Sequence, residues 1–334
     1  MAYNVNATNM ADAIKVMYEK RLLSRALPRL VHGRWGRPAT LNKFGSMEIR
    51  KYSALSVISS TLGEGSTPSE QSAPSISTVT LDPNWYGAWI GITDQVQLES
   101  MDPLVIETSG ILGEQAGLSA DTLVRNALIA GATASYTGGV SAVASMDAPD
   151  CNIGYADVVK AIGTLEAANA RPLDGGRFVL ILHPHSYASL MQDATFVNLF
   201  TNESEPNALR TGKMGYLLNC DIYITSNAYE SADAGVSSTT DVYGAIYIGA
   251  DSFAVAGMAG LDVKNVDMAG TDEYTMTGKS VRPVDIIVKP VDSGGAENPL
   301  NQRGSIGWKM THDCEILDST WILNQYHTNV FSDD

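Results

Sequence analysis

The clearest pattern in the chain is the alternation of side chains over residues 85–98. Apolar side chains fall on one face of this segment, and glycine, threonine and glutamine fall largely on the other. This period of two predicts a long strand with one apolar face, to which Asp94 is the exception. Trp85 and Trp89 add aromatic surface to the opposite face, which indicates either a second packing layer or a contact with another subunit.

A helical pattern covers residues 103–132, which at about 1.5 Å per residue would span roughly 45 Å. Pro103 stands near its start, where proline is favoured. Arg125 follows Asp121 by four residues, a spacing that predicts an ion pair. Residues at intervals of seven predict the core-facing side, with carboxylates along its margin: Leu104, Ile111 and Leu118, then Glu107, Glu114 and Asp121. Three glycines weaken the helix or admit another backbone: Gly110, Gly113 and Gly117.

The first part of the chain predicts a helix followed by a long projection. Residues 11–31 have helical periodicity, which Pro28 ends or kinks. Residues 47–57 alternate over parts of their length and predict a strand. Residues 61–78 are rich in serine, glycine and proline, offer no packing face, and predict a turn-rich tip between two extended flanks.

Strands dominate the remainder of the chain, so the fold class is α+β, and we see neither a βαβ repeat nor an internal sequence repeat. Helices are predicted at residues 155–168 and 186–200. The predicted strands are residues 178–182, 217–225, 243–248, 252–256, 281–291, 305–310 and 315–326.

Charge is divided unequally along the chain. The first 51 residues hold ten basic and three acidic side chains, whereas the whole chain carries a net charge of −15. A cationic segment beside an anionic body favours head-to-tail contacts between copies, although a solvated amphipathic helix or a nucleic-acid contact would also fit. The candidate contact residues are Arg21, Arg25, Arg29, Arg50 and Lys51, together with Trp85 and Trp89.

Length and composition allow one or two ordinary domains with projections. A chain of 334 residues with 44% apolar content can bury a core without staples. Cys151, Cys220 and Cys314 match neither a zinc site nor a redox pair, so we expect buried thiols and folding in a reducing cytoplasm. We find no signal-peptide pattern and no apolar run long enough to span a membrane.

Each candidate motif for catalysis or ligand binding lacks a residue or a spacing that its chemistry requires. Residues 278–280 end like a phosphate-binding loop, but Glu273 stands where that motif needs glycine. His183 and His185 flank a proline, and we expect a loop-capping role for them in preference to half of a metal site. The acids of residues 262–273 lack the spacing of a calcium loop. We therefore predict no cofactor, no metal and no enzymatic activity, although a site assembled only in three dimensions stays open.

The order of basic arm, projection, long helix and strand-rich body resembles the major capsid proteins of tailed bacteriophages, which have the Hong Kong 97-type fold. Residues 81–94 (LDPNWYGAWIGITD) and 107–132 are in particular similar to the coliphage N-four coat branch. The resemblance implies an N-terminal arm at residues 1–43 and an extended loop with flanking strands at 44–98. It further implies a peripheral domain at 99–177 with spine helix 103–132, an axial domain at about 178–276, and return strands at 277–334.

The resemblance also implies a function. A structural protein of this family would self-assemble into hexamers and pentamers of an icosahedral head around double-stranded DNA, without reading its sequence, after assembly in the host cytoplasm. A separate scaffold, a portal and decoration proteins would be its partners, and no membrane is involved. Residues 52–80 contain no lysine, so the lysine crosslink of some relatives is not expected and the shell would be non-covalent. An encapsulin-type compartment and a cytosolic α+β enzyme are the alternatives.

Overall fold

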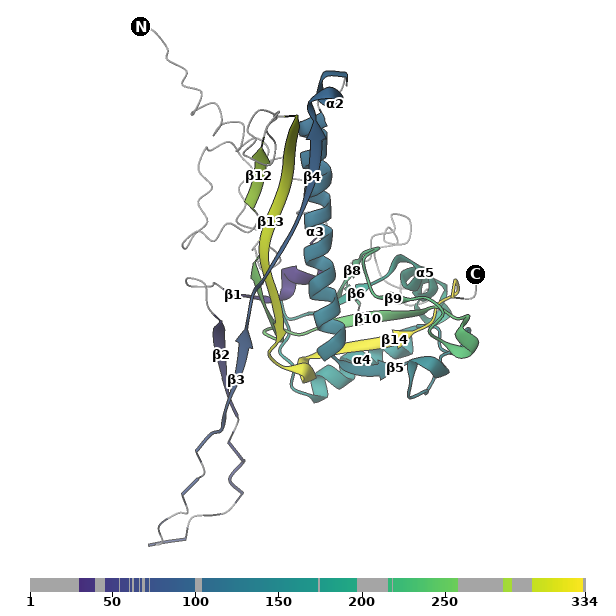
Figure 1. The fold of residues 1–334 in the computed structure, drawn as a ribbon. Helices are drawn as coiled ribbons and strands as arrows, with labels where there is room; N and C mark the ends of the chain where they lie inside the picture. The colour runs from purple at the N-terminus through teal and green to yellow at the C-terminus, as the bar shows by residue number, and fades with distance from the viewer. Residues whose placement is uncertain are drawn as a thin grey trace.

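The computed structural model describes residues 30–39, 46–53, 55–59, 61, 63–65, 67, 70–71, 73–99, 104–173, 175–196, 216–217, 219–257, 285–289 and 302–332. Three parts make up this structure: a long helix backed by one sheet, a second sheet across one end of that helix, and a hairpin that projects from the body (Figure 1). The arrangement confirms the predicted α+β class.

The long helix α3 (Leu104–Gly131) packs against a sheet whose central strand is β13 (Arg303–Ile316). Along one edge of β13 lies β4 (Asn84–Thr93), paired antiparallel through ten residues. Along the other edge, β12 (Asp285–Lys289) and β11 (Phe253–Gly257) both pair with β13, one after the other along its length. β11 also pairs with β1 (Arg37–Ala39) on its far side. One strand thus organises the whole sheet.

The second sheet lies across the C-terminal end of α3 (Figure 1). At its centre are β6 (Phe178–Leu182) and β10 (Val242–Ile248), in which every residue is buried. The flanking strands are β14 (Ile322–His327), β5 (Thr133–Tyr136), β8 (Cys220–Ile224), β7 (Tyr216–Leu217) and β9 (Glu230–Ser231). β6 and β8 run parallel across a connection that contains α5 (Pro184–Gln192), so one βαβ unit is present, and the described strands form no series of such units.

Burial on both faces explains why these central strands are continuously apolar. In β6, Val179 and Ile181 join the core of α3, whereas Phe178, Leu180 and Leu182 join a second core. That second core is covered by α4 (Tyr155–Ala167), through Val158, Ala161, Ile162 and Leu165. The sheet therefore lies between the two cores and contributes side chains to both.

The hairpin consists of β2 (Met47–Tyr52) and β3 (Ile76–Leu81), an antiparallel pair that belongs to neither large sheet. It points away from the body, and its two arms separate beyond the ladder before they meet at the tip (Figure 1). The predicted projection is confirmed, with β2 ending at Tyr52 and not at residue 57.

The predicted core face of α3 is wrong. Ile111 and Leu118 are 58% and 43% exposed, and the buried stripe instead follows an interval of four: Leu112, Ala116, Ala120, Val124 and Leu128. Small alanines in mid-stripe allow the helix to approach β13 closely, an arrangement that a search for large apolar residues does not detect. Asp121 is fully buried and Arg125 donates to Asn227, so the predicted ion pair between them is also wrong.

The predicted strand at residues 85–98 ends at Thr93, and α2 (Asp94–Glu99) follows it. Asp94, the exception in the alternating pattern, marks the change. Its Oδ1 accepts a hydrogen bond from the Gln95 N–H at 2.7 Å, and Thr93 Oγ1 accepts one from the Val96 N–H at 3.4 Å. Such side-chain oxygens satisfy the free N–H groups at a helix start.

Two further boundaries differ from prediction. The predicted strands 305–310 and 315–326 are divided differently, because β13 runs unbroken to Ile316 and the break falls at a 3₁₀ turn, Ser319–Trp321. Asp318 caps that turn by accepting from the Thr320 N–H at 3.2 Å. The helix predicted at 186–200 corresponds to α5, which begins at Pro184 and ends at Gln192, and that predicted at 155–168 is confirmed as α4. Residues 11–29 of the predicted first helix lie outside the described residues.

We predict unequal effects for two leucine truncations on α3. Leu128→Ala removes a fully buried side chain and should lower the free energy of unfolding by about 2–5 kcal/mol. Leu118→Ala, on the exposed side, should change it by less than about 0.5 kcal/mol. Urea unfolding of isolated subunits measures both, and equal losses would contradict the period-four core.

Candidate assembly surfaces

The hairpin carries apolar side chains that nothing in the described part of its own subunit covers. Val57 is 93% exposed, Ile58 65% and Leu55 57%, and Tyr52 and Ile76 are exposed on the ladder itself. Single exposed apolar residues are ordinary, but a contiguous set on a projection marks an interaction surface. The hairpin therefore has the character of a contact that is completed by another molecule.

The base of the hairpin is tied to the body by an ion pair. Lys51 Nζ donates to Asp318 Oδ2, and the two residues are 267 positions apart in the sequence. Burial works to raise the pKa of Asp318, but the hydrogen bonds from Lys51 and Thr320 outweigh it and hold that pKa below its ordinary value. Lys51, a predicted inter-subunit residue, thus has an intramolecular partner, whereas Arg50 on the same strand is exposed.

Trp85 and Trp89 lie on the face of β4 opposite α3, as the sequence predicts. They are 52% and 73% exposed, and the Lys309 Nζ lies 3.9 Å from the centre of the Trp85 ring. Glycines alternate with them: a Cβ at Gly91 would lie 3.3 Å from the Trp89 ring, and one at Gly307 would lie 2.8 Å from the Trp89 Cβ. The glycines thus give the indoles room to lie on the sheet.

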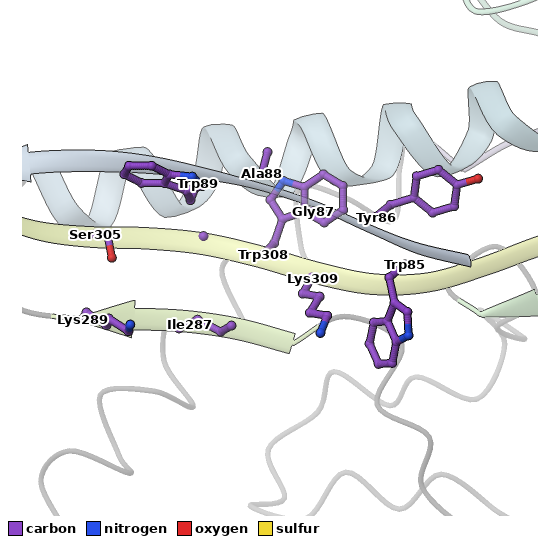
Figure 2. A pocket seen from close by; sticks show the side chains of 11 residues that line it. Trp85, Tyr86, Gly87, Ala88, Trp89, Ile287, Lys289, Ser305, Trp308 and Lys309 are labelled. Carbon is purple, nitrogen blue, oxygen red and sulfur yellow. The ribbon is translucent and has the colours of Figure 1, made fainter. Parts of the chain in front are cut away.

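The two tryptophans form one wall of a shallow groove of about 660 Å³ across the outer face of the sheet. Ile287 and Lys289 of β12 form the other wall, and Ser305 of β13 lies between (Figure 2). Gly307 of β13 also lies between, because it pairs with Trp89 on one side and with Ile287 on the other. Trp308, from the same strand, turns the opposite way and donates through Nε1 to Gln115 Oε1 of α3 at 3.2 Å. The outer face is therefore apolar with lysines at its margin.

The remaining predicted contact residues, Arg21, Arg25 and Arg29, lie outside the described residues. The described part of the chain begins at Leu30. The residues that follow contact a buried polar cluster that we did not predict. Asp121 Oδ1 accepts from the N–H groups of Val31 and His32 at 2.8 and 2.7 Å. Asp121 Oδ2 pairs with His32 Nδ1 at 2.8 Å and accepts from Asn227 Nδ2 at 2.9 Å. One carboxylate thus joins the arm, α3 and the loop after β8.

Burial of Asp121 works to raise its pKa, but the hydrogen bonds and charge interaction with His32 and the bond from Asn227 outweigh burial. The pKa is held below its ordinary value, so the carboxylate form is the one that the cluster stabilises. The sequence did not reveal this role, because the intervals of seven placed Asp121 only at the margin of a face on which Ile111 and Leu118 are exposed.

His183, for which we expected a loop-capping role, caps the start of a helix. Its Nδ1 accepts from the His185 N–H at 3.2 Å at the start of α5, and Pro184 follows at the first helical position. His185 Nδ1 in turn lies 3.2 Å from the hydroxyl of Tyr243, which donates to Glu230 at 2.8 Å. The prediction of buried thiols is also confirmed, since Cys151, Cys220 and Cys314 are free and buried.

Chemistry-bearing groups do not gather elsewhere in the part of the chain that the structure describes. Within it, no three His, Cys, Asp or Glu side chains are placed to hold a metal ion. None of the described helices has the length and apolarity that crossing a membrane requires. The phosphate-loop ending at residues 278–280 and the acids of residues 262–273 lie outside it.

The family model described as phage capsid protein matches residues 77–323, from β3 to β14. The chain belongs to this family. It is a major capsid protein, which assembles with copies of itself into the shell of a phage head and is found in the virion. Its family and fold are those of a structural protein.

Solved phage capsids share the fold of this capsid protein. The capsid of Ralstonia phage GP4 is 13% identical, with a TM-score of 0.63 over 90% of this chain and 88% of that one. The capsid of cyanophage P-SCSP1u is 13% identical, with a TM-score of 0.62 over 90% and 88%. That of Helicobacter pylori bacteriophage KHP30 is 12% identical, with a TM-score of 0.59 over 89% of each chain. The predicted Hong Kong 97-type fold is thus confirmed.

No curated protein matches the chain by sequence. The resemblance to the coliphage N-four branch stays a prediction.

We predict that Asp121→Asn lowers subunit stability in a pH-dependent way. Because the folded pKa of Asp121 is depressed, its contribution is fully present above the unfolded pKa of about 3.9 and is lost as pH falls through the folded value. The variant should lose about 1–3 kcal/mol for each buried donor left without a good acceptor at pH 7, and the loss should shrink in acid.

Urea unfolding of isolated subunits between pH 7 and pH 3 measures this difference. The matched control is Glu166→Gln, which changes an exposed carboxylate on α4. A difference between wild type and Asp121→Asn that stays constant across this range would refute the assignment.

Proposed function

We propose that the subunits build an icosahedral head around double-stranded DNA, and that non-covalent contacts hold hexamers and pentamers of the chain together. One observation carries the proposal: the hairpin and the outer face of β4 present apolar side chains that their own subunit leaves exposed, from 52% for Trp85 to 93% for Val57. Many such contacts of modest strength make a closed shell stable, because each subunit is held by several neighbours at once.

The basic segment adds an electrostatic contact to this assembly. Its residues 1–51 carry ten basic and three acidic side chains in a chain of net charge −15, so the rest of each copy is strongly anionic. In our proposal, Arg21, Arg25 and Arg29 meet acidic surface on a neighbour. The acidic body would in turn repel phosphate and so avoid tight binding of the packaged DNA, whose sequence it would not read.

The second sheet with α4 and α5 is our candidate for the axial domain. We predicted that domain at residues 178–276 between peripheral segments 99–177 and 277–334. Strand pairing favours a different division, because β5 and β14 belong to the same sheet as β6 and β10, whereas β11 pairs with β13. We therefore assign β5, α4 and β14 to the axial side, and α3 with the first sheet to the peripheral side.

The partners of the shell follow from the same proposal. A separate scaffold, a portal and decoration proteins would act with the subunits, and assembly would take place in the host cytoplasm. Negative-stain electron microscopy of the purified protein, alone and with its genomic neighbours, tests the proposal. Closed shells with enclosed DNA are expected, and small oligomers in both samples would refute it.

We predict that assembled particles contain no covalent multimers. Lys51 at the base of the hairpin is paired with Asp318, residues 52–80 contain no lysine for an isopeptide crosslink, and the three cysteines that the chain contains are buried and free. Denaturing gels of particles, run with and without reductant, should show one band at the subunit mass of 35.6 kDa. A ladder of multimers would contradict the prediction.

We further predict that reversing Arg21, Arg25 and Arg29 to Glu impairs assembly and leaves the subunit folded, because the proposed partners belong to neighbours. Particle yield by sedimentation and the folded state by circular dichroism measure the two effects. A triple lysine variant, which keeps the charge, is the control and should assemble. Normal particles from the glutamate variant would refute the proposed electrostatic contact.

A further inference from the structure

Three of the chain's five histidines meet at the end of the second sheet that lies away from α3 (Figure 1). His183 and His185 stand at the start of α5, and His327 is the last residue of β14. All three surround Tyr243 of β10, and their ring centroids lie 5.1, 5.9 and 6.4 Å from the centroid of the tyrosine ring. We call these three residues the histidine cluster.

Two members of the histidine cluster use a ring nitrogen as a hydrogen-bond acceptor. His183 Nδ1 accepts from the His185 N–H at the start of α5. His327 Nδ1 lies 3.1 Å from the Gln325 carbonyl oxygen, which can only accept, so the proton of the neutral ring is on Nδ1. The other nitrogen, Nε2, then accepts from the Ser186 hydroxyl at 2.7 Å. Both bonds require neutral imidazoles.

The same two histidines are buried, since His183 is 7% exposed and His327 is fully covered. Burial lowers the pKa of both, to about 4 for His327. Glu230 of β9 works to raise the pKa of His183, but burial outweighs it. A proton on either ring would therefore remove an acceptor and place a charge in a covered site.

The acids that act on the cluster are few. Glu230 accepts from the Tyr243 hydroxyl at 2.8 Å, and the charge of Asp241, just before β10, also acts on Tyr243. Neither carboxylate is a hydrogen-bond partner of His183 or His327. Protonated rings would consequently repel one another, with His183 and His185 centred only 4.6 Å apart.

The segment after β14, residues 328–332, packs on the cluster, and we call it the strap. The Phe331 ring lies 5.0 Å from that of His185, and the Ser332 carbonyl accepts from the Asp241 N–H at 2.9 Å. At its other end, the Thr328 N–H donates to the Cys151 carbonyl at 3.0 Å. The strap has no ionisable side chain, so it cannot neutralise charge that appears beneath it.

We propose that the histidine cluster is an acid-sensitive latch: when His183 and His327 take up protons, the strap and the first turn of α5 separate from the second sheet. Separation lets water reach both charged rings, and it breaks only the contacts at this end of the sheet. The central strands β6 and β10 stay paired. The latch lies within one subunit, so it does not rest on the proposed shell.

The direction of the pH dependence follows from the buried state. The closed latch holds neutral histidines, whereas in the open latch their pKa returns to about 6.5, so opening binds protons. Opening is therefore least favourable above about pH 7. It becomes more favourable as pH falls from about 6.5 toward the closed-state pKa, which is about 4 for His327, by up to about tenfold per pH unit for each histidine.

Residue-resolved hydrogen exchange of isolated subunits between pH 7.5 and pH 4.5, corrected for the intrinsic pH dependence of exchange, tests the latch. The reporters are the amides of Thr328 and Asp241, which form the two hydrogen bonds of the strap. Their protection should fall at least about tenfold by pH 5, whereas the amide of Ile246, in the middle of β10, stays protected. Strap amides that stay protected at pH 5, or that lose protection together with Ile246, would overturn the proposal.

The double variant His183→Asn, His327→Gln removes the two titrating rings. Asparagine keeps a capping acceptor at the start of α5, and glutamine keeps a polar side chain opposite Ser186. The variant should retain its pH 7 protection of the strap down to pH 5. The matched control is His312→Gln, because His312 of β13 is 2% exposed and burial lowers its pKa to about 4, but it lies outside the histidine cluster.

Acid opening that persists in the double variant, or that disappears in His312→Gln, would refute the latch. Circular dichroism at pH 7 shows whether each variant folds. If the double variant does not fold, NMR titration of the five wild-type imidazoles decides the question. His183 and His327 should then take up protons over the same pH range in which the strap amides open, and a strap that opens while both rings are neutral would overturn the proposal.

Discussion

The packing of α3 on β13 is the contact on which the other parts of the subunit depend. The stripe Leu112, Ala116, Ala120, Val124 and Leu128 is buried in one core with Ile306, Trp308 and Met310 of β13. β4, β11 and β12 are held in place because they pair with that strand. The hairpin is the continuation of β4 through β3, so its direction is also set by this contact (Figure 1). A small-residue stripe brings helix and sheet close, and close packing resists bending.

Two polar contacts then attach the projecting parts to this frame. Asp121, on the helix itself, receives the backbone of Val31 and His32 where the basic segment joins the body. Lys51, at the base of the hairpin, pairs with Asp318 at the turn between β13 and β14. Asp121 is buried with all its partners close by, whereas Lys51 is half exposed, so the first contact should contribute far more than the second. The arm is therefore anchored firmly at its root, and the hairpin is held mainly by its strand connection.

A shell protein has to satisfy opposite requirements with one chain. Its body must be stable before assembly, which the two cores on either side of the second sheet provide. Its contact surfaces must remain incomplete until a neighbour arrives, and the subunit shows this in the exposed side chains of the hairpin and of β4. The same alternation that packs Tyr86, Ala88 and Ile92 against the core of the helix places Trp85 and Trp89 outward. A single strand thus serves the subunit with one face and the assembly with the other.

The sequence alone determined the local elements and their order. Periodicity located α3, α4, β6 and the hairpin closely, because burial of one or both faces imposes a repeat that any core of that kind requires. The family resemblance then supplied the Hong Kong 97-type fold. The sequence did not determine which residues of α3 face the core, since Ala116 and Ala120 carry too little apolar surface to mark a face, whereas Ile111 and Leu118 are large and exposed. Nor could it pair Asp121 with His32, Lys51 with Asp318, or β14 with β5. These contacts join residues that are from 89 to 267 positions apart, and only the tertiary structure brings them together, because nothing in local spacing records which distant strand or loop will supply a partner.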